Sequence, residues 1–107
     1  MAGSVEDFPF GPEVAVFKVG GKMFAVVSLE DQPGSVSLKC DPSYAVALRE
    51  QYAAVTAGYH LDKRHWNTVR LDGSVPDEEL EEWIGESHAL VVAGLTRAQR
   101  RRVLGEE

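Results

Sequence analysis

The pattern of apolar and polar positions predicts β-strands in the first 40 residues, starting at residue 13. Residues 13–19 and 22–29 are rich in β-branched and aromatic side chains, and Gly20 and Gly21 between them are typical of a two-residue hairpin turn. After a turn at 30–34, residues 35–40 predict a strand with one buried and one exposed face. Its two faces hold Val36, Leu38 and Cys40 on one side, and Ser35, Ser37 and Lys39 on the other.

Helical signals dominate the second half of the chain. Asp41 followed by Pro42 is typical of a helix start and predicts a helix to about Tyr52. Pro76 and the acidic residues after it predict a second helix that ends at Gly94, and Thr96 is expected to cap a final, arginine-rich helix. The packed face of the second helix is predicted to hold Leu80, Trp83, Ile84, Ser87 and Val91.

Residues 66–71 predict a fourth strand, and residues 53–65 are expected to be irregular. Because the first three strands are joined too tightly for crossovers, antiparallel pairing is expected. The fold class is therefore α+β, a single domain over residues 1–107 with a four-stranded antiparallel sheet covered on one face by helices.

The other face of this sheet is expected to be open to solvent. If Val69 and Leu71 point inward, then Trp66, Thr68 and Arg70 point outward. The open face is then expected to carry Lys39, Trp66 and Arg70, with Lys22 and Phe24 as neighbours. A register slip of one residue would invert this assignment.

Composition and net charge exclude several classes of protein. The 107 residues carry a net charge of −6, which excludes a basic, histone-like nucleic-acid binder but allows a local basic face. A single cysteine, Cys40, excludes an internal disulfide and fits a reducing compartment. Neither a signal peptide nor a membrane span is visible, so we expect a cytoplasmic protein that does not bind membranes.

The segment 59–66 concentrates aromatic rings, imidazoles and cations. Lys63 and Arg64 can pair with phosphates, while Tyr59, His65 or Trp66 can stack on a base or lie against a sugar. The structural alternative is a loop in which Trp66 plugs the sheet edge and both cations are simply solvated.

Metal and catalytic sites are not expected. His60, His65 and Asp62 could ligate zinc, but their loop spacing is not the i, i+4 spacing of a helical metal pair. Cys40 is expected to face the core, and no serine lies in a nucleophile-elbow motif. We therefore expect no metal, no cofactor, no catalytic residue and no enzymatic activity.

Five blocks of the chain resemble the MmcQ/YjbR family. They are residues 6–12 (EDFPFGP), 16–25 (VFKVGGKMFA), 36–42 (VSLKCDP), 58–67 (GYHLDKRHWN) and 75–80 (VPDEEL). The resemblance implies a CyaY-like, or frataxin-like, two-layer domain that binds DNA with a double-wing arrangement. It also implies a helix before the first block, which is expected to be missing here, leaving part of the helix-side face uncovered. Asp62 stands where the family more often has asparagine.

Two charged helices are open to competing interpretations. Residues 77–86 hold six acidic and no basic residues, and the rest of the chain sums to zero charge. By analogy with frataxins this acidic run could handle iron, but solubility and helix-dipole complementarity are the simpler explanation. Arg97, Arg100, Arg101 and Arg102 either balance these acids or contact phosphates.

Two functions therefore stay open. The first is weak, non-specific DNA binding by a monomer or homodimer, through the open sheet face and the 59–66 loop. Its candidate residues are Lys22, Lys39, Tyr59, Lys63, Arg64, His65, Trp66 and Arg70. The second is a protein-interaction or adaptor domain that docks a protein partner on a surface centred on Trp66. Trp66 is expected to be partly exposed.

Overall fold

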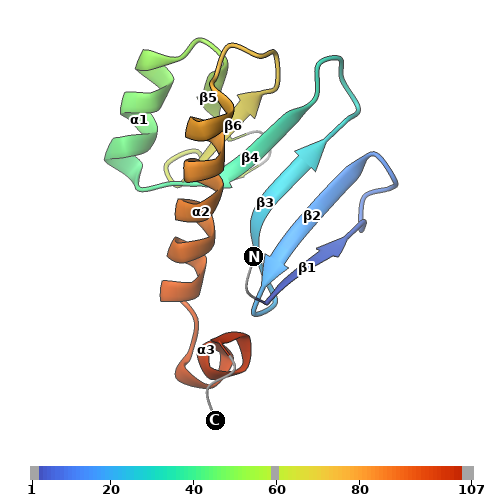
Figure 1. Cartoon of the computed structure of the whole chain (residues 1–107), viewed down its shortest axis with the longest axis vertical. Coiled ribbons are helices and arrows are strands. Elements are labelled where there is room, and N and C mark those ends of the chain that lie inside the picture. Colours follow the sequence, from blue (N-terminus) through green and yellow to red (C-terminus); the bar gives the residue numbers. More distant parts are fainter. Residues whose placement is uncertain (1–2, 59–60, 105–107) are drawn as a thin grey trace.

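The computed structural model describes residues 3–58 and 61–104, and it contains one sheet and three helices (Figure 1). The strands are β1 (Ser4–Asp7), β2 (Val14–Val19), β3 (Lys22–Ser28), β4 (Ser35–Lys39), β5 (Val55–Ala57) and β6 (Trp66–Arg70). The helices are α1 (Pro42–Gln51), α2 (Asp77–Ala93) and α3 (Arg97–Leu104). None of the helices in the described ranges is both long and apolar enough to cross a membrane.

The sheet has six strands in the order β1-β2-β3-β4-β6-β5, and every neighbouring pair is antiparallel. The predicted α+β class and antiparallel pairing are confirmed, but the prediction of four strands is wrong. The two missed strands are the edge strands, β1 with four residues and β5 with three. Strands this short show no alternation that distinguishes them from a loop, and their pairing partners define them.

Local signals place the turns and helix ends as predicted. Gly20 and Gly21 join β2 to β3 with φ values of 59° and 80°, the left-handed region that a tight hairpin requires. The Asp41 carboxylate caps α1 by accepting hydrogen bonds from the backbone N–H groups of Ser43 and Tyr44. At α3 the Thr96 hydroxyl accepts from the Gln99 N–H, while the Gln99 side chain accepts from the Thr96 N–H.

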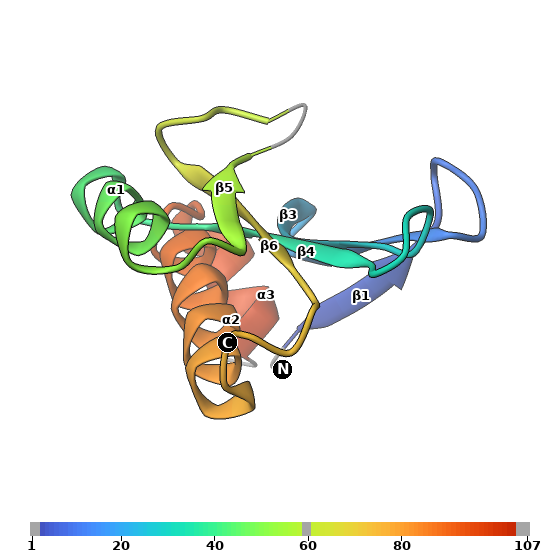
Figure 2. The same ribbon diagram turned by 90° about the horizontal axis from the view of Figure 1, so that it is seen from above.

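Helices α1 and α2 lie on the same face of the sheet, and the opposite face carries no helix of the described ranges (Figure 2). Helix α1 packs against β5 and β6, where the Asn67 side-chain amide donates to the Ala45 carbonyl at 3.2 Å. Helix α2 packs against β3 and β4 and contacts β2. One face of the sheet is thus buried by helices, as an antiparallel sheet allows.

The main core lies between these helices and the sheet. Trp83 of α2 is only 4% exposed, as its place on the predicted packed face requires, and its ring meets Tyr52 edge-on at 5.4 Å. The sheet contributes Ala25, Val36, Leu38 and Val69 to the same cluster. The helices therefore hold the strands together chiefly by apolar burial.

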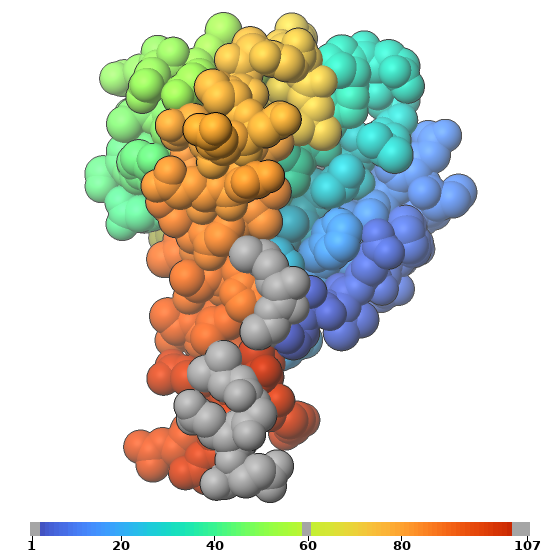
Figure 3. Space-filling view, in the orientation of Figure 1, coloured from blue at the N-terminus to red at the C-terminus, as the bar shows by residue number. Residues whose placement is uncertain are grey.

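Beyond α2, the helix side of the sheet is less covered. Figure 3 shows β2 and β3 at the surface beside α2 in the view of the helix side. Phe17 and Val27 are half-buried there and pack against the edge of the core cluster. The helices thus bury the β4–β6 half of the sheet more completely than the β1–β2 edge.

Strand β3 contains an irregularity that sequence alternation does not show. Phe17 pairs with Ala25 and Lys18 pairs with Met23, so Phe24 has no partner in β2. Phe24 is 3% exposed, and its ring meets His88 of α2 at 5.0 Å. The expectation that Phe24 adjoins the open face is therefore wrong, because the bulge directs this ring toward the helices.

Ser87 bridges the two strands beside this bulge. The hydroxyl of this fully buried residue donates to the Phe24 carbonyl and accepts from the Lys39 N–H at 2.8 Å. The residue pairing between β3 and β4 ends one position earlier, at Ala25 and Leu38. A helix side chain thus satisfies two strand backbone groups that the ladder does not pair.

Candidate functional site

Cross-strand register defines the side chains of the open face. In the β4–β6 pair, Lys39 lies opposite Trp66 and Ser35 lies opposite Arg70, and directly opposed residues point to the same face. The structure therefore brings Lys39, Trp66 and Arg70 together on one face, and the buried Asn67 and Val69 point to the helices. Leu71, expected to point inward, is 37% exposed because β6 ends at Arg70.

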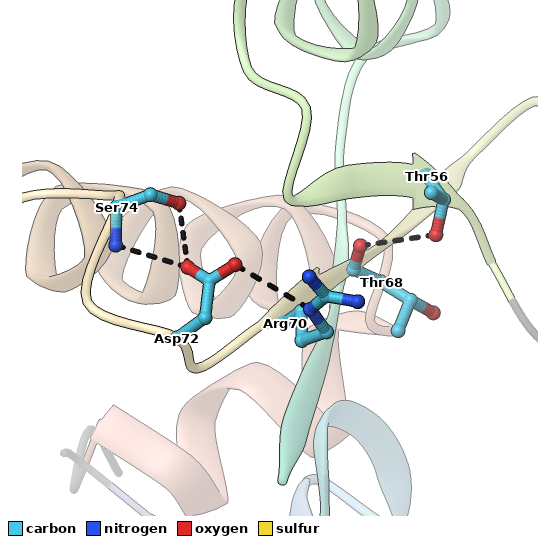
Figure 4. A network of polar contacts seen from close by, with 5 residues as sticks. All are labelled: Thr56, Thr68, Arg70, Asp72 and Ser74. Carbon is cyan, nitrogen blue, oxygen red and sulfur yellow. Dashed lines mark hydrogen bonds and ion pairs between the residues drawn. The ribbon is translucent and has the colours of Figure 1, made fainter. Parts of the chain in front are cut away.

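Hydroxyl groups run across the middle of this face. The Ser37 and Thr68 hydroxyl oxygens are 2.8 Å apart, and the Thr56 hydroxyl donates to the Thr68 carbonyl at 3.4 Å (Figure 4). Ser37 is only 7% exposed, so the hydroxyl-bearing residues of this face that solvent reaches are Thr56, which is exposed, and Thr68, which is half-buried. Such a surface can contact a phosphate or sugar closely, whereas long side chains would hold it away.

Arg70 is exposed and forms an ion pair with a neighbouring carboxylate. Its Nε donates to Asp72 at 3.4 Å, and the Asp72 carboxylate also accepts hydrogen bonds from the N–H and hydroxyl of Ser74 (Figure 4). The Ser74 hydroxyl is the main reason that the pKa of Asp72 lies below its ordinary value. Only Nε of Arg70 is used in this contact, so the two terminal nitrogens can reach another acceptor.

Trp66 lies on the open side of β6 but is buried, with only 9% of its surface exposed. Gly58, which follows β5, donates its N–H to the Trp66 carbonyl at 2.9 Å. A Cβ at position 58 would lie 2.7 Å from the Trp66 Cβ, so the backbone passes directly against the tryptophan. The prediction of partial exposure is therefore wrong, because the backbone at Gly58 packs against the tryptophan at this end of β6.

Asp62 organises the segment that leads into β6. Its carboxylate accepts the Arg64 N–H at 2.9 Å and lies 3.0 Å from the His65 Nδ1. The hydrogen bond from Arg64 is the main reason that the pKa of Asp62 lies below its ordinary value, and the contact with His65 adds to it. This carboxylate thus shapes the loop, although it also reduces the loop's positive charge.

Lys63 and Arg64, the two cations of the loop, differ in how their side chains are engaged. The Lys63 ammonium donates to the Gly58 carbonyl at 3.1 Å, and Arg49 of α1 donates to the Lys63 carbonyl at 3.2 Å. Arg64 is exposed. Two further loop candidates, Tyr59 and His60, lie outside the described residues. Arg64 is therefore the loop cation that is best placed to meet a ligand.

Lys22 does not share the open face. It lies at the end of the β2–β3 hairpin, opposite Val19, whose side chain is fully buried in the main core. Directly opposed residues share a face, so Lys22 projects on the helix side. The expectation that Lys22 neighbours Lys39 and Arg70 on the open face is therefore wrong, because the bulge at Phe24 changes the parity of β3.

The alternative chemistries find little support among residues 3–58 and 61–104. No group of three histidine, cysteine or acidic side chains within these ranges is close enough to hold a metal ion. Burial, with further contributions from Glu86 and Asp41, raises the pKa of the Cys40 thiol to about 11. A thiol with so high a pKa is almost entirely protonated near neutral pH and is a poor nucleophile.

The helices carry charge of both signs, because α3 holds Arg97, Arg100, Arg101 and Arg102. The acidic residues 77–86 belong to the start of α2, which lies on the helix side. The open face carries Lys18, Lys39 and Arg70, and Lys18 lies 3.9 Å from Asp7. The open face is thus weakly positive on a molecule whose net charge is −6.

The family relationship follows from comparison with known proteins. A family model described as YjbR matches residues 1–90. The chain belongs to the YjbR family. The uncharacterized protein YbdF of Escherichia coli O157:H7 is 36% identical over 96 residues, which cover 90% of this chain and 79% of YbdF. The uncharacterized protein YjbR of E. coli K12 is 38% identical over 84 residues, covering 78% of this chain and 71% of that protein.

Solved structures of the same fold support this assignment. The crystal structure of Deinococcus radiodurans protein DR2400 superposes with a TM-score of 0.89 at 41% identity, covering 96% of this chain and 79% of that chain. A protein from Pseudomonas syringae superposes with a TM-score of 0.69 at 26% identity, covering 78% of this chain and 83% of that chain. The names of these YjbR relatives assign no activity, so a function must be argued from the site.

Proposed function

We propose that this YjbR-family protein binds nucleic acid weakly and without sequence preference, through the open face of its sheet. The proposal is one of binding and not of catalysis. The DNA-binding role and the CyaY-like relationship that the family resemblance implies both stay predictions. One observation carries the proposal. Lys39, Arg70 and a band of hydroxyl groups lie together on one face of the sheet, and no helix of the described residues covers that face.

The geometry of this face suits a phosphate backbone better than a base edge. Hydroxyls and cations are the groups with which proteins position nucleic-acid backbones. Reading base edges in a duplex needs a helix or ribbon that enters a groove, whereas all three helices lie away from this face. We therefore expect backbone contacts and no sequence preference.

The affinity should be low and strongly dependent on salt. Apart from Lys18, which lies 3.9 Å from Asp7, four cations lie on the face or in its bordering loop and can contact phosphates, namely Lys39, Lys63, Arg64 and Arg70. Four contacts predict that log K falls with log salt at a slope of about −3 to −4. Asp62, which accepts the Arg64 backbone N–H, and Asp72, which pairs with Arg70, lower the attraction further.

A charge-reversal pair with a matched control tests the proposal. Lys39→Glu/Arg70→Glu should abolish fluorescence-polarisation binding to a single- or double-stranded oligonucleotide at low salt. Lys22→Glu/Arg97→Glu changes the net charge equally at exposed positions outside the open face, so it should weaken binding only modestly. Equal losses in both variants would show a non-local charge effect, and no loss in the first variant would refute the sheet-face model.

Docking of a protein partner is the second candidate function, and exposed apolar side chains favour it. Phe10 is 71% exposed and Phe8 is 47% exposed, both in the loop between β1 and β2. Trp66 no longer supports a docking surface, because it is buried. Aromatic docking should change little with added salt, whereas phosphate binding decays, so a salt titration separates the two functions.

A further inference from the structure

A small cavity lies under α2, on the helix side of β4 and β6. Cys40, Asn67, Trp83 and Glu86 contribute its polar lining, and apolar side chains that include Leu48 and Val69 complete it. The space available to the centre of a water-sized sphere is about 10 Å³. That volume is close to the minimum that holds one water molecule.

Two of the lining residues each hold a buried polar atom that has no hydrogen-bond partner. These atoms are the Oδ1 of Asn67, a residue 3% exposed, and the Nε1 of Trp83, a residue 4% exposed. The orientation of the Asn67 amide is determined, because its Nδ2 donates to the Ala45 carbonyl, which can only accept. Oδ1 is therefore an acceptor without a donor, while Nε1 is a donor without an acceptor.

Such a pair of atoms is costly unless a further group satisfies it. A buried polar group left unpaired costs about 1–3 kcal/mol. Water carries both functions at once, since it can donate to a carbonyl oxygen and accept from an indole N–H. Its second hydrogen can be directed to the Glu86 carboxyl or the Cys40 sulfur, which line the same cavity.

We infer that this cavity is a specific site for one buried water molecule, which accepts from Trp83 Nε1 and donates to Asn67 Oδ1. The water links α2 to β6, and through the Asn67 amide it also links both to α1. The site is separate from the open face, so the inference is independent of nucleic-acid binding.

Tyr44 is the competing acceptor. Burial raises the pKa of Tyr44, and a hydrogen bond between its hydroxyl and the Trp83 indole opposes this rise, although the geometry of that contact is not that of a regular hydrogen bond. Tyr44 is 39% exposed, so its hydroxyl can also be hydrated from outside. A modest rotation of Tyr44 would replace the water at Nε1, and the experiment must separate the two arrangements.

Water-selective NMR on ¹⁵N-labelled protein is the direct test. The indole N–H signals of Trp66 and Trp83 are assigned from Trp66→Phe, in which the Trp83 signal remains. In a rotating-frame experiment, the Trp83 indole proton should show a water cross-peak of opposite sign to the diagonal, the signature of a bound water. An absent cross-peak, or one with the sign of chemical exchange, would overturn the inference.

Two variants complete the test. Tyr44→Phe should leave the Trp83 indole shift and its water cross-peak unchanged, whereas an upfield shift of the indole proton would assign the contact to the tyrosine. Asn67→Val should remove the cross-peak by deleting the acceptor, and its persistence would place the water elsewhere. If Asn67→Val does not fold, the wild-type and Tyr44→Phe spectra still decide the question.

Discussion

Replacing Ser87 by alanine should lower the free energy of unfolding by about 2–4 kcal/mol. The hydroxyl is fully buried and satisfies both the Phe24 carbonyl and the Lys39 N–H. Alanine has no hydroxyl, so it can make neither hydrogen bond. Two backbone groups between β3 and β4 would then be left without partners.

The magnitude follows from those two groups. Each buried donor or acceptor left unpaired costs about 1–3 kcal/mol, which gives about 2–6 kcal/mol for the pair. Lys39 is only half-buried, so partial hydration places its contribution in the lower part of that range. The higher helix propensity of alanine returns about 0.5 kcal/mol. The net expectation is a loss of about 2–4 kcal/mol.

Urea denaturation followed by far-UV circular dichroism measures this loss. Glu81→Ala is the matched control, because Glu81 is an exposed position of the same helix, where alanine should change stability by less than about 0.5 kcal/mol. Propensity alone would make Ser87→Ala neutral or stabilising. A midpoint for Ser87→Ala equal to or above that of the wild type would refute the bridging role of the hydroxyl.

Three other outcomes are expected. Trp66→Ala should cost about 3–5 kcal/mol in the same urea assay, and a loss below about 1 kcal/mol would show that the indole is not packed. Because the pKa of Cys40 is about 11, a disulfide reagent at pH 8 should label the folded protein far more slowly than the denatured protein; equal rates would contradict its burial. Burial is the main reason that the pKa of Glu86 is raised, and the nearby Glu82 and Glu79 raise it further. Ionisation of Glu86 therefore disfavours the folded state at pH values above its unfolded pKa, which is near 4.5. Glu86→Gln should therefore be more stable than the wild type at pH 7 and lose this advantage below about pH 4, and an advantage independent of pH would contradict the linkage.

The candidate site was only partly predictable from the sequence. Strict alternation in β4 and β6 was enough to join Lys39, Trp66 and Arg70 on one face, because side chains of a regular strand alternate whatever packs on them. The burial of Trp66 was not predictable, because it depends on the backbone at Gly58, which packs against the tryptophan only once β5 has paired with β6. Asn67 did carry a signal, since it shares the inward parity of Val69 and is a polar residue where an apolar one is expected.

The sequence by itself determined the elements whose stabilising contacts are local. The Gly20 and Gly21 hairpin, the Asp41 cap of α1 and the Thr96 cap of α3 depend on backbone groups within a few residues, so adjacent residue types suffice to specify them.

Only the tertiary structure decided the two edge strands, the bulge at Phe24 and the burial of Trp66. Each depends on groups far apart in the chain: β5 on β6, Phe24 on His88 and Ser87, and Trp66 on the backbone at Gly58. Hydrogen bonds and apolar contacts of that kind form only once the sheet has assembled and the helices have packed on it. The residues that make these contacts therefore show no periodic pattern in the sequence from which the contacts could be predicted.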